Sequence, residues 1–178
     1  MSNGLLIVVI ILVVIGLGLS MGFHAYNLVK WMSARGSKLV SKIELTNPTK
    51  RLAIKELQIF NAAGSKLTPY VDFYFYPQTA YNVAKPVAYI AGYAFDGVTD
   101  TNVGTNFVTG APGKLSIFLK IPQEISSIKI FNASGTIDGT SVAPDLASAT
   151  LSTYNGADVL IKSWPCTEAL EQTFSMTA

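Results

Sequence analysis

The chain has 178 residues, of which 49% are hydrophobic and 13% are charged, with a single cysteine and a single histidine. One cysteine excludes an internal disulfide framework, and the length is enough for one domain with a hydrophobic core. The net charge of +2 is uneven, because residues 1–42 hold four bases and no acid, whereas residues 43–178 hold nine bases against eleven acids. This acidic excess argues against the basic surface that nucleic-acid binding requires, so we expect no nucleic-acid partner.

The N-terminal stretch is strongly apolar. Residues 5–19 read LLIVVIILVVIGLGL without one polar side chain, and the first charged side chain is Lys30. A membrane-spanning helix needs about 20 mostly apolar residues, and residues 3–23 meet that length. We therefore predict a transmembrane anchor with its juxtamembrane segment over residues 1–35 and a separate domain over residues 36–178. The anchor and its interfacial end are marked by Leu5, Ile10, Val14, Leu19, Tyr26 and Trp31.

The flank of the predicted span indicates its orientation. The bases that follow the span are Lys30, Arg35, Lys38 and Lys42. Bases at this position mark the cytoplasmic side, so we expect a single-pass protein with a cytosolic C-terminal domain. A cleaved signal peptide fits less well, because the basic start and the cleavage site of such peptides are missing. Gly18 and Gly22 have the spacing that lets two membrane helices pack closely, although glycine is also simply common in such helices.

From residue 38 onward the pattern is typical of strands separated by turns. The predicted strands, in chain order, are 39–46, 52–61, 71–76, 87–95, 114–121, 127–132, 150–154, 159–164 and 173–176. Asn155-Gly156 is the strongest hairpin signal in the chain. About eight strands at this spacing, without a helical stretch between them, predict an all-β domain built as an antiparallel jelly-roll-type sandwich.

Four segments resemble a known family. AFDGVTDT at residues 94–101 resembles a turn of galactose-binding-like (discoidin-type) β-sandwich domains, and GKLSIFL at 113–119 is similar to the strand that follows this turn. PQEISSIKIFN at 122–132 and IKELQIFN at 54–61 resemble two further strands of the family. The resemblance covers roughly residues 40–176. It implies a β-sandwich, and many members of the family bind sugars or lipid headgroups at loops on one end.

The same resemblance suggests a metal site. In calcium-bearing members an Asp and nearby loop oxygens bind a structural ion, and the matching candidates here are Asp96, Asp100 and Thr101. The simpler interpretation is a turn capped by the Asp96 carboxylate, with Gly97 at a positive φ and no metal. We therefore expect no cofactor, with a structural Ca²⁺ as the alternative.

The remaining chemistry points away from an enzyme. We find no phosphate loop, nucleophile elbow or zinc-ligand spacing, and Cys166 has no histidine nearby in the sequence to act as its base. Sugar sites generally combine aromatic rings with Arg, His or Asn, but Arg51 is the only arginine beyond the juxtamembrane segment. The candidates for contact with another protein are the aromatic residues Tyr70, Tyr74 and Tyr76.

These features together resemble minor structural proteins of large double-stranded DNA viruses, in which an internal membrane lies beneath an icosahedral capsid. The resemblance implies a minor capsid protein of the virion that tethers this membrane to capsid proteins. The alternative is a membrane-anchored module that binds glycans or lipid headgroups. A subunit of a pilus or surface filament is a third interpretation.

Overall fold

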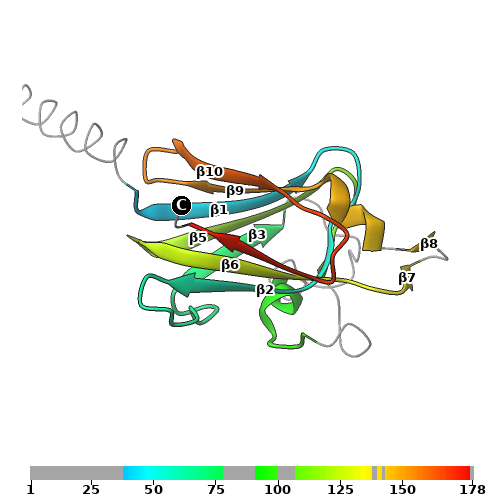
Figure 1. Ribbon diagram of the computed structural model, residues 1–178, viewed down its shortest axis with the longest axis horizontal. Helices are drawn as coiled ribbons and strands as arrows, with labels where there is room; N and C mark the ends of the chain where they lie inside the picture. Colours follow the sequence, from blue (N-terminus) through cyan, green and yellow to red (C-terminus); the bar gives the residue numbers. More distant parts are fainter. Residues whose placement is uncertain (1–37, 78–90, 100–106, 138–139, 142, 177–178) are drawn as a thin grey trace, which may run out of the picture. The chain divides into compact units, whose positions relative to one another are not determined.

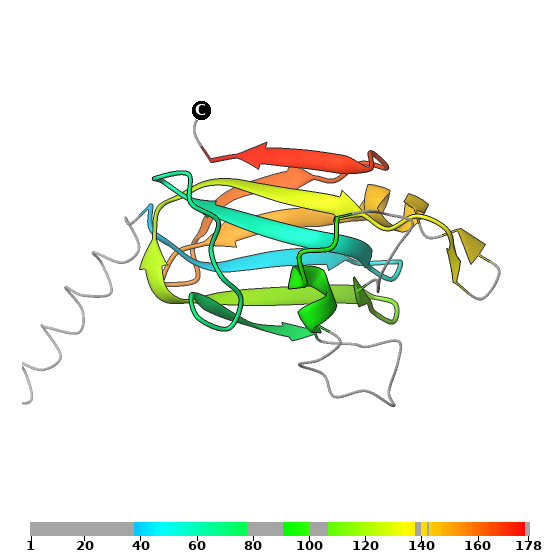
Figure 2. The ribbon, with the colours of Figure 1, turned by 90° about the horizontal axis from the view of Figure 1, so that it is seen from below.

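The computed structural model describes residues 38–77, 91–99, 107–137, 140–141 and 143–176. Within the compact unit Lys38–Ala178, the strands form two antiparallel sheets packed as an all-β sandwich (Figure 1, Figure 2). No helix in the described part of the chain is long and apolar enough to cross a membrane. The predicted span at residues 3–23 lies outside the described residues, as do its flanking bases Lys30 and Arg35.

Sheet A has five strands in the order β10-β9-β1-β5-β3. Their bounds are Val40–Asn47 for β1, Phe73–Pro77 for β3, Gly113–Gln123 for β5, Thr150–Tyr154 for β9 and Leu160–Pro165 for β10. Sheet B has four strands in the order β11-β6-β2-β4. Their bounds are Ala53–Asn61 for β2, Phe107–Val108 for β4, Ile125–Asn132 for β6 and Glu171–Ser175 for β11.

Three short elements complete the described fold. A two-stranded ribbon pairs β7, Thr136–Ile137, with β8, Thr140–Ser141. Two 3₁₀ helices are η1, Tyr93–Phe95, and η2, Ala143–Ser148.

The core lies between the two sheets and follows from the alternation of the strand sequences. In β1 the buried residues Ile43 and Leu45 alternate with the half-buried Lys42, Glu44 and Thr46. Successive side chains of a strand point to opposite faces, so one face of each sheet is apolar and packs inward. The inward side chains that are at most 1% exposed include Ile43, Leu45, Leu115, Ile117 and Leu151 of sheet A and Leu57, Ile59, Ile128 and Ile130 of sheet B.

The sandwich has two ends that differ in what they carry. At one end, on the left of Figure 1, β1 begins, β5 ends and the β9–β10 hairpin turns; we call this the proximal end and the opposite one the distal end. Val40 pairs with Gln123 at the proximal end. Lys38 and Met176 line the same hollow of about 430 Å³, so the described chain enters and leaves at this end. At the distal end Asn47 pairs with Gly113, and η2 and the β7–β8 ribbon lie nearby.

Most predicted strands are confirmed within one or two residues, but the prediction of a strand at 87–95 is wrong where the structure describes it. Residues 91–95 are helical and end in η1. Ala91, Ala94 and Phe95 are buried, and their i, i+3, i+4 spacing is the period of a helix rather than of a strand. The Phe95 ring packs on Phe73 and Phe75, with centroids 5.0 and 4.8 Å apart.

The hairpin signal at Asn155-Gly156 is confirmed with a longer loop than a two-residue turn. The loop spans residues 155–159, and the Asn155 N–H donates to the Val159 carbonyl at 3.0 Å. The buried Asn155 side chain accepts from the N–H groups of Ala157 and Val159 at 2.9 and 3.1 Å. This side chain therefore fixes the loop by satisfying its backbone donors.

Candidate functional site

The outer face of sheet A carries a row of aligned side chains that crosses all five strands. Tyr74 pairs with Phe118, Phe118 with Lys42, Lys42 with Tyr154, and Tyr154 with Leu160. Paired residues of neighbouring strands project from the same side of a sheet. We call this set the aromatic row.

Ring contacts give the aromatic row a defined geometry. The Tyr74 and Phe118 rings stack with centroids 5.3 Å apart and an interplanar angle of 18°. The Lys42 ammonium lies 4.4 Å from the centroid of the Tyr154 ring, within the range of a cation–π contact. Tyr74 is nevertheless 56% exposed and Leu160 is 53% exposed. The row therefore offers ordered apolar surface to a partner.

Ion pairs hold the charged side chains of this face. Lys42 Nζ lies 2.6 Å from the Asp158 carboxylate and 3.6 Å from that of Glu44, which also pairs with Lys114 at 2.9 Å. Burial opposes the charge of Glu44, but the hydrogen bond and attraction of Lys114, together with Lys42, outweigh it and lower its pKa. Burial likewise opposes the charge of Lys42, yet its hydrogen bond to Asp158 and the attraction of Glu44 raise its pKa. Both groups are therefore charged at neutral pH.

A second row runs alongside the aromatic row. Tyr76, Ser116, Glu44, Ser152 and Ser163 pair in succession across the five strands. Tyr76 is 62% exposed, and the Ser152 and Ser163 hydroxyls lie 3.0 Å apart. The outer face thus combines exposed rings with small hydroxyl groups and fixed charges.

The predicted contact aromatics do not form one patch. Tyr74 and Tyr76 lie on the outer face of sheet A. Tyr70 lies in the loop before β3, where its ring meets the Phe75 ring edge-on at 5.3 Å. Sequence reasoning missed Phe118, Tyr154 and Leu160. Phe118 could have been found as a large apolar residue at an outward position of an alternating strand, but its alignment with Tyr154 depends on pairing through β1.

Lys42 of the predicted basic flank belongs to the described domain. It lies within β1, as the predicted strand at 39–46 implies, and its charge is paired with Asp158 and Glu44. The orientation stays a prediction from the whole flank.

The turn at Asp96-Gly97 is capped by side chains of the domain. Asp96 Oδ1 accepts from the Val98 N–H at 2.9 Å, and Gly97 has a φ of 85°, as the capped-turn interpretation expects. The Gly97 N–H donates to the buried Glu56 at 3.1 Å, and Lys66 Nζ lies 3.0 Å from the same carboxylate. Burial raises the pKa of Glu56, although the contacts with Lys66 and the Gly97 N–H act to lower it.

The calcium alternative stays a prediction. None of the described residues form a group of three or more metal-binding His, Cys, Asp or Glu side chains. Asp100 and Thr101 lie outside the described residues. The predicted strand at 87–95 would have placed this turn at the end of a strand. In the structure the turn follows η1 instead.

Cys166 is an unreactive thiol in this fold. It is 4% exposed, and burial raises its pKa to about 12. The thiolate is the nucleophilic form of cysteine, so at neutral pH this side chain is protonated and inert.

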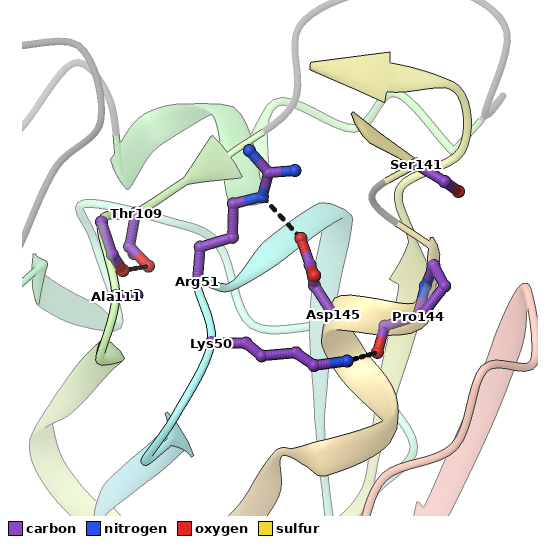
Figure 3. A pocket seen from close by; sticks show the side chains of 8 residues that line it. Lys50, Arg51, Thr109, Ala111, Ser141, Pro144 and Asp145 are labelled. Carbon is purple, nitrogen blue, oxygen red and sulfur yellow. Dashed lines mark hydrogen bonds and ion pairs between the residues drawn. The ribbon is translucent and has the colours of Figure 1, made fainter. Parts of the chain in front are cut away.

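A hollow of about 710 Å³ opens at the distal end (Figure 3). The side chains of Arg51 and Asp145 point toward one another across it, with Nε 2.6 Å from the carboxylate, and Lys50 Nζ lies 3.4 Å from the Pro144 carbonyl. The residues lining the hollow are Lys50, Arg51, Thr109, Gly110, Ala111, Ser141, Pro144 and Asp145. The two bases and one acid leave a net charge of +1 at this hollow.

No family model, curated protein or solved structure matches the chain. The resemblance to galactose-binding-like domains therefore remains a prediction from the four quoted segments. The class that the fold itself defines is an all-β sandwich of two antiparallel sheets.

Proposed function

We propose that this protein is a membrane-anchored structural protein whose sandwich holds a protein partner through the outer face of sheet A. The observation that carries the proposal is the aromatic row, in which Tyr74 and Phe118 of adjacent strands align with Tyr154 across Lys42 of β1. Aromatic residues are enriched at the buried centres of protein interfaces, where they supply contact area at low entropic cost. The neighbouring ion pairs are already formed, so partner binding does not have to order them.

The size of this face indicates the kind of contact it makes. Neighbouring strands lie about 4.8 Å apart, so a row over five strands spans about 19 Å. From Lys42 to Thr46 the face extends about 14 Å along the strand, which gives an area on the order of 300 Å². A standard interface buries about 800 Å² on each partner, so one such face makes a weak contact. Many copies held side by side in one membrane would bind a repeating partner through avidity.

A capsid is a repeating partner of this kind. The more specific form of the proposal is a minor capsid protein of a large double-stranded DNA virus, located in the virion and linking an internal membrane to the shell. The anchor at residues 3–23, the cytosolic orientation, the jelly-roll topology and the galactose-binding-like family belong to the same proposal. Its support is the resemblance in sequence together with a face suited to weak, repeated contacts.

The test is site-specific photo-crosslinking in membranes or particles that contain the full-length chain. A photo-reactive phenylalanine analogue replaces Tyr76 on the outer face of sheet A, and the matched control replaces the exposed Thr173 of β11. We expect position 76 to crosslink to a shell protein, and Tyr74→Ala to reduce the yield. Adducts that form equally at position 173, or that contain only lipid, would contradict the proposal. Protease protection in sealed membranes tests the orientation separately, because a shielded domain would mean that it is not cytosolic.

The second candidate function is glycan binding. Two observations favour it: the stacked Tyr74 and Phe118 rings, and the position of Arg51 in the distal hollow. Rings can stack on sugar faces, and a guanidinium can bind a carboxylate or several hydroxyl groups. Glycan-array binding by the full-length protein in detergent that is lost in Tyr74→Ala or Arg51→Gln, but retained in Thr173→Ala, would favour this function over the structural one.

A further inference from the structure

The most exposed large apolar side chains among the described residues lie at the proximal end. Ile121 is 73% exposed and Val71 is 67% exposed, and Leu39, beside the start of β1, is 40% exposed. Residues 71 and 121 are close to each other, because the Lys120 N–H donates to the Asp72 carbonyl at 3.0 Å. We call Val71 and Ile121 the apolar tip.

The register of sheet A makes Ile121 project. Lys42 pairs with Phe118 and Val40 pairs with Gln123, so four residues of β5 lie opposite the single residue Ser41. A bulge of this kind bends its strand and leaves the extra residues without partners in the ladder. Residues 120–122 are all exposed within it. The exposure of Ile121 is therefore built into the strand pairing.

Val71 is held by an equally specific turn. The Thr68 N–H donates to the Asp72 carboxylate at 2.5 Å, and the Asp72 N–H donates to the Thr68 carbonyl at 3.0 Å. Between them Tyr70 has a φ of 68°, a conformation that is strained for a residue with a side chain. The Lys120 ammonium donates to the Tyr70 carbonyl and so joins this turn to the bulge. Strain of this kind persists where the surrounding contacts enforce it, and it is concentrated at functional positions.

The chain itself limits what this end can reach. Only residues 24–37 separate the predicted span from Lys38, where the described chain enters the proximal end. Fourteen residues cover about 21 Å as a helix and at most about 50 Å when fully extended. The linker thus sets this limit on the distance from the predicted span to Lys38, at the end of the sandwich that also carries the apolar tip. The exposed Leu170 lies at the distal end, before β11.

We propose that the apolar tip of Val71 and Ile121 inserts into the headgroup region of the bilayer that carries the anchor, and so holds the proximal end of the sandwich against the lipid surface. This proposal rests on the membrane anchoring proposed above. Apolar side chains of surface-bound segments enter about 5–10 Å into the boundary between headgroups and acyl chains. A tip docked in this way leaves the distal end facing away from the bilayer and the outer face of sheet A accessible from the side.

The experiment uses the full-length protein reconstituted in phosphatidylcholine vesicles. Single substitutions Val71→Cys, Ile121→Cys and Leu170→Cys carry an environment-sensitive fluorophore, and Leu170 is the matched control because it is an exposed apolar residue, 56% accessible, at the other end. The native Cys166 is buried, and mock labelling of the parent protein measures its background. Some vesicles contain phosphatidylcholine with a nitroxide near the top of its acyl chain, which quenches only fluorophores at that depth. Circular dichroism establishes that each variant is folded.

We expect blue-shifted emission and nitroxide quenching at positions 71 and 121, several times stronger than at position 170. An alkaline wash removes proteins that are not anchored in the membrane. If the protein resists this wash but quenching is equally weak at all three positions, the tip insertion is overturned and the anchoring stands. A blue shift at position 121 without quenching would also overturn it, because protein rather than lipid would then cover the tip. Loss of the protein from the vesicles in the alkaline wash would refute the anchoring, and the tip insertion with it.

Discussion

Glu56 offers a sharp test of the energetics of this fold, because a carboxylate with no exposed side-chain surface supports the Asp96-Gly97 turn. Its two oxygens accept from the Gly97 N–H at 3.1 Å and from Lys66 Nζ at 3.0 Å. We predict that Glu56→Gln changes the free energy of unfolding by less than about 1 kcal/mol, because an amide oxygen still accepts from Gly97 and no charge remains buried. Glu56→Ala removes the acceptor and leaves a cavity.

We expect Glu56→Ala to lower the free energy of unfolding by about 1–3 kcal/mol, because the partly buried Gly97 N–H is left without its acceptor. The full cost of breaking a buried ion pair, about 3–5 kcal/mol, does not apply, since the 38% exposed side chain of Lys66 can be solvated. Urea unfolding of the full-length protein in detergent measures both values. In a Trp31→Phe background the fluorescence reports Trp164, whose ring lies 5.8 Å from that of Phe174.

The pH dependence provides a second readout. Burial raises the folded-state pKa of Glu56 above its ordinary value of 4.5, so the folded state binds this proton more tightly than the unfolded state does. Its contribution to stability is complete below pH 4.5 and is lost as the pH rises through the folded pKa. Glu56→Gln should remove this loss, whereas Glu44, whose pKa is lowered, contributes only to the loss of stability at more acidic pH. Equal destabilisation by Gln and Ala, or an unchanged slope above pH 4.5 in Glu56→Gln, would refute the reasoning.

Three further predictions concern other parts of the domain. Phe118→Ala removes the stack with Tyr74. It should lower the free energy of unfolding by about 0.5–1.5 kcal/mol more than the loss of buried area alone would, and it should reduce crosslinking from position 76. Unchanged crosslinking would argue against the outer face as the contact surface. Cys166 should react with maleimide only after unfolding, because its pKa is raised to about 12, and fast labelling of the native protein at pH 7 would contradict its burial. Gly113→Ala places a Cβ 2.6 Å from the Leu52 backbone nitrogen and should lower the unfolding midpoint in urea sharply, whereas a midpoint within error of wild type would show that the backbone can yield.

Local patterns account for most of the strands. Alternation in β1 and β5 identifies which residues face inward, because a period of two leaves few alternatives once one face is apolar. The same rule failed at residues 91–95, where Ala91, Ala94 and Phe95 follow the helical period. It also gave no indication of β4, β7 and β8, which are only two residues long.

The sequence by itself determined that the domain is all-β, where its main strands lie and that a long apolar stretch precedes it. Only the tertiary structure decided that Tyr74, Phe118, Lys42, Tyr154 and Leu160 form one row, because strands far apart in the chain become neighbours through β1. It also showed Ile121 to be exposed by a bulge and brought Val71 beside it. Strand order and register depend on packing between distant segments, and a pattern within one strand carries no information about its neighbours.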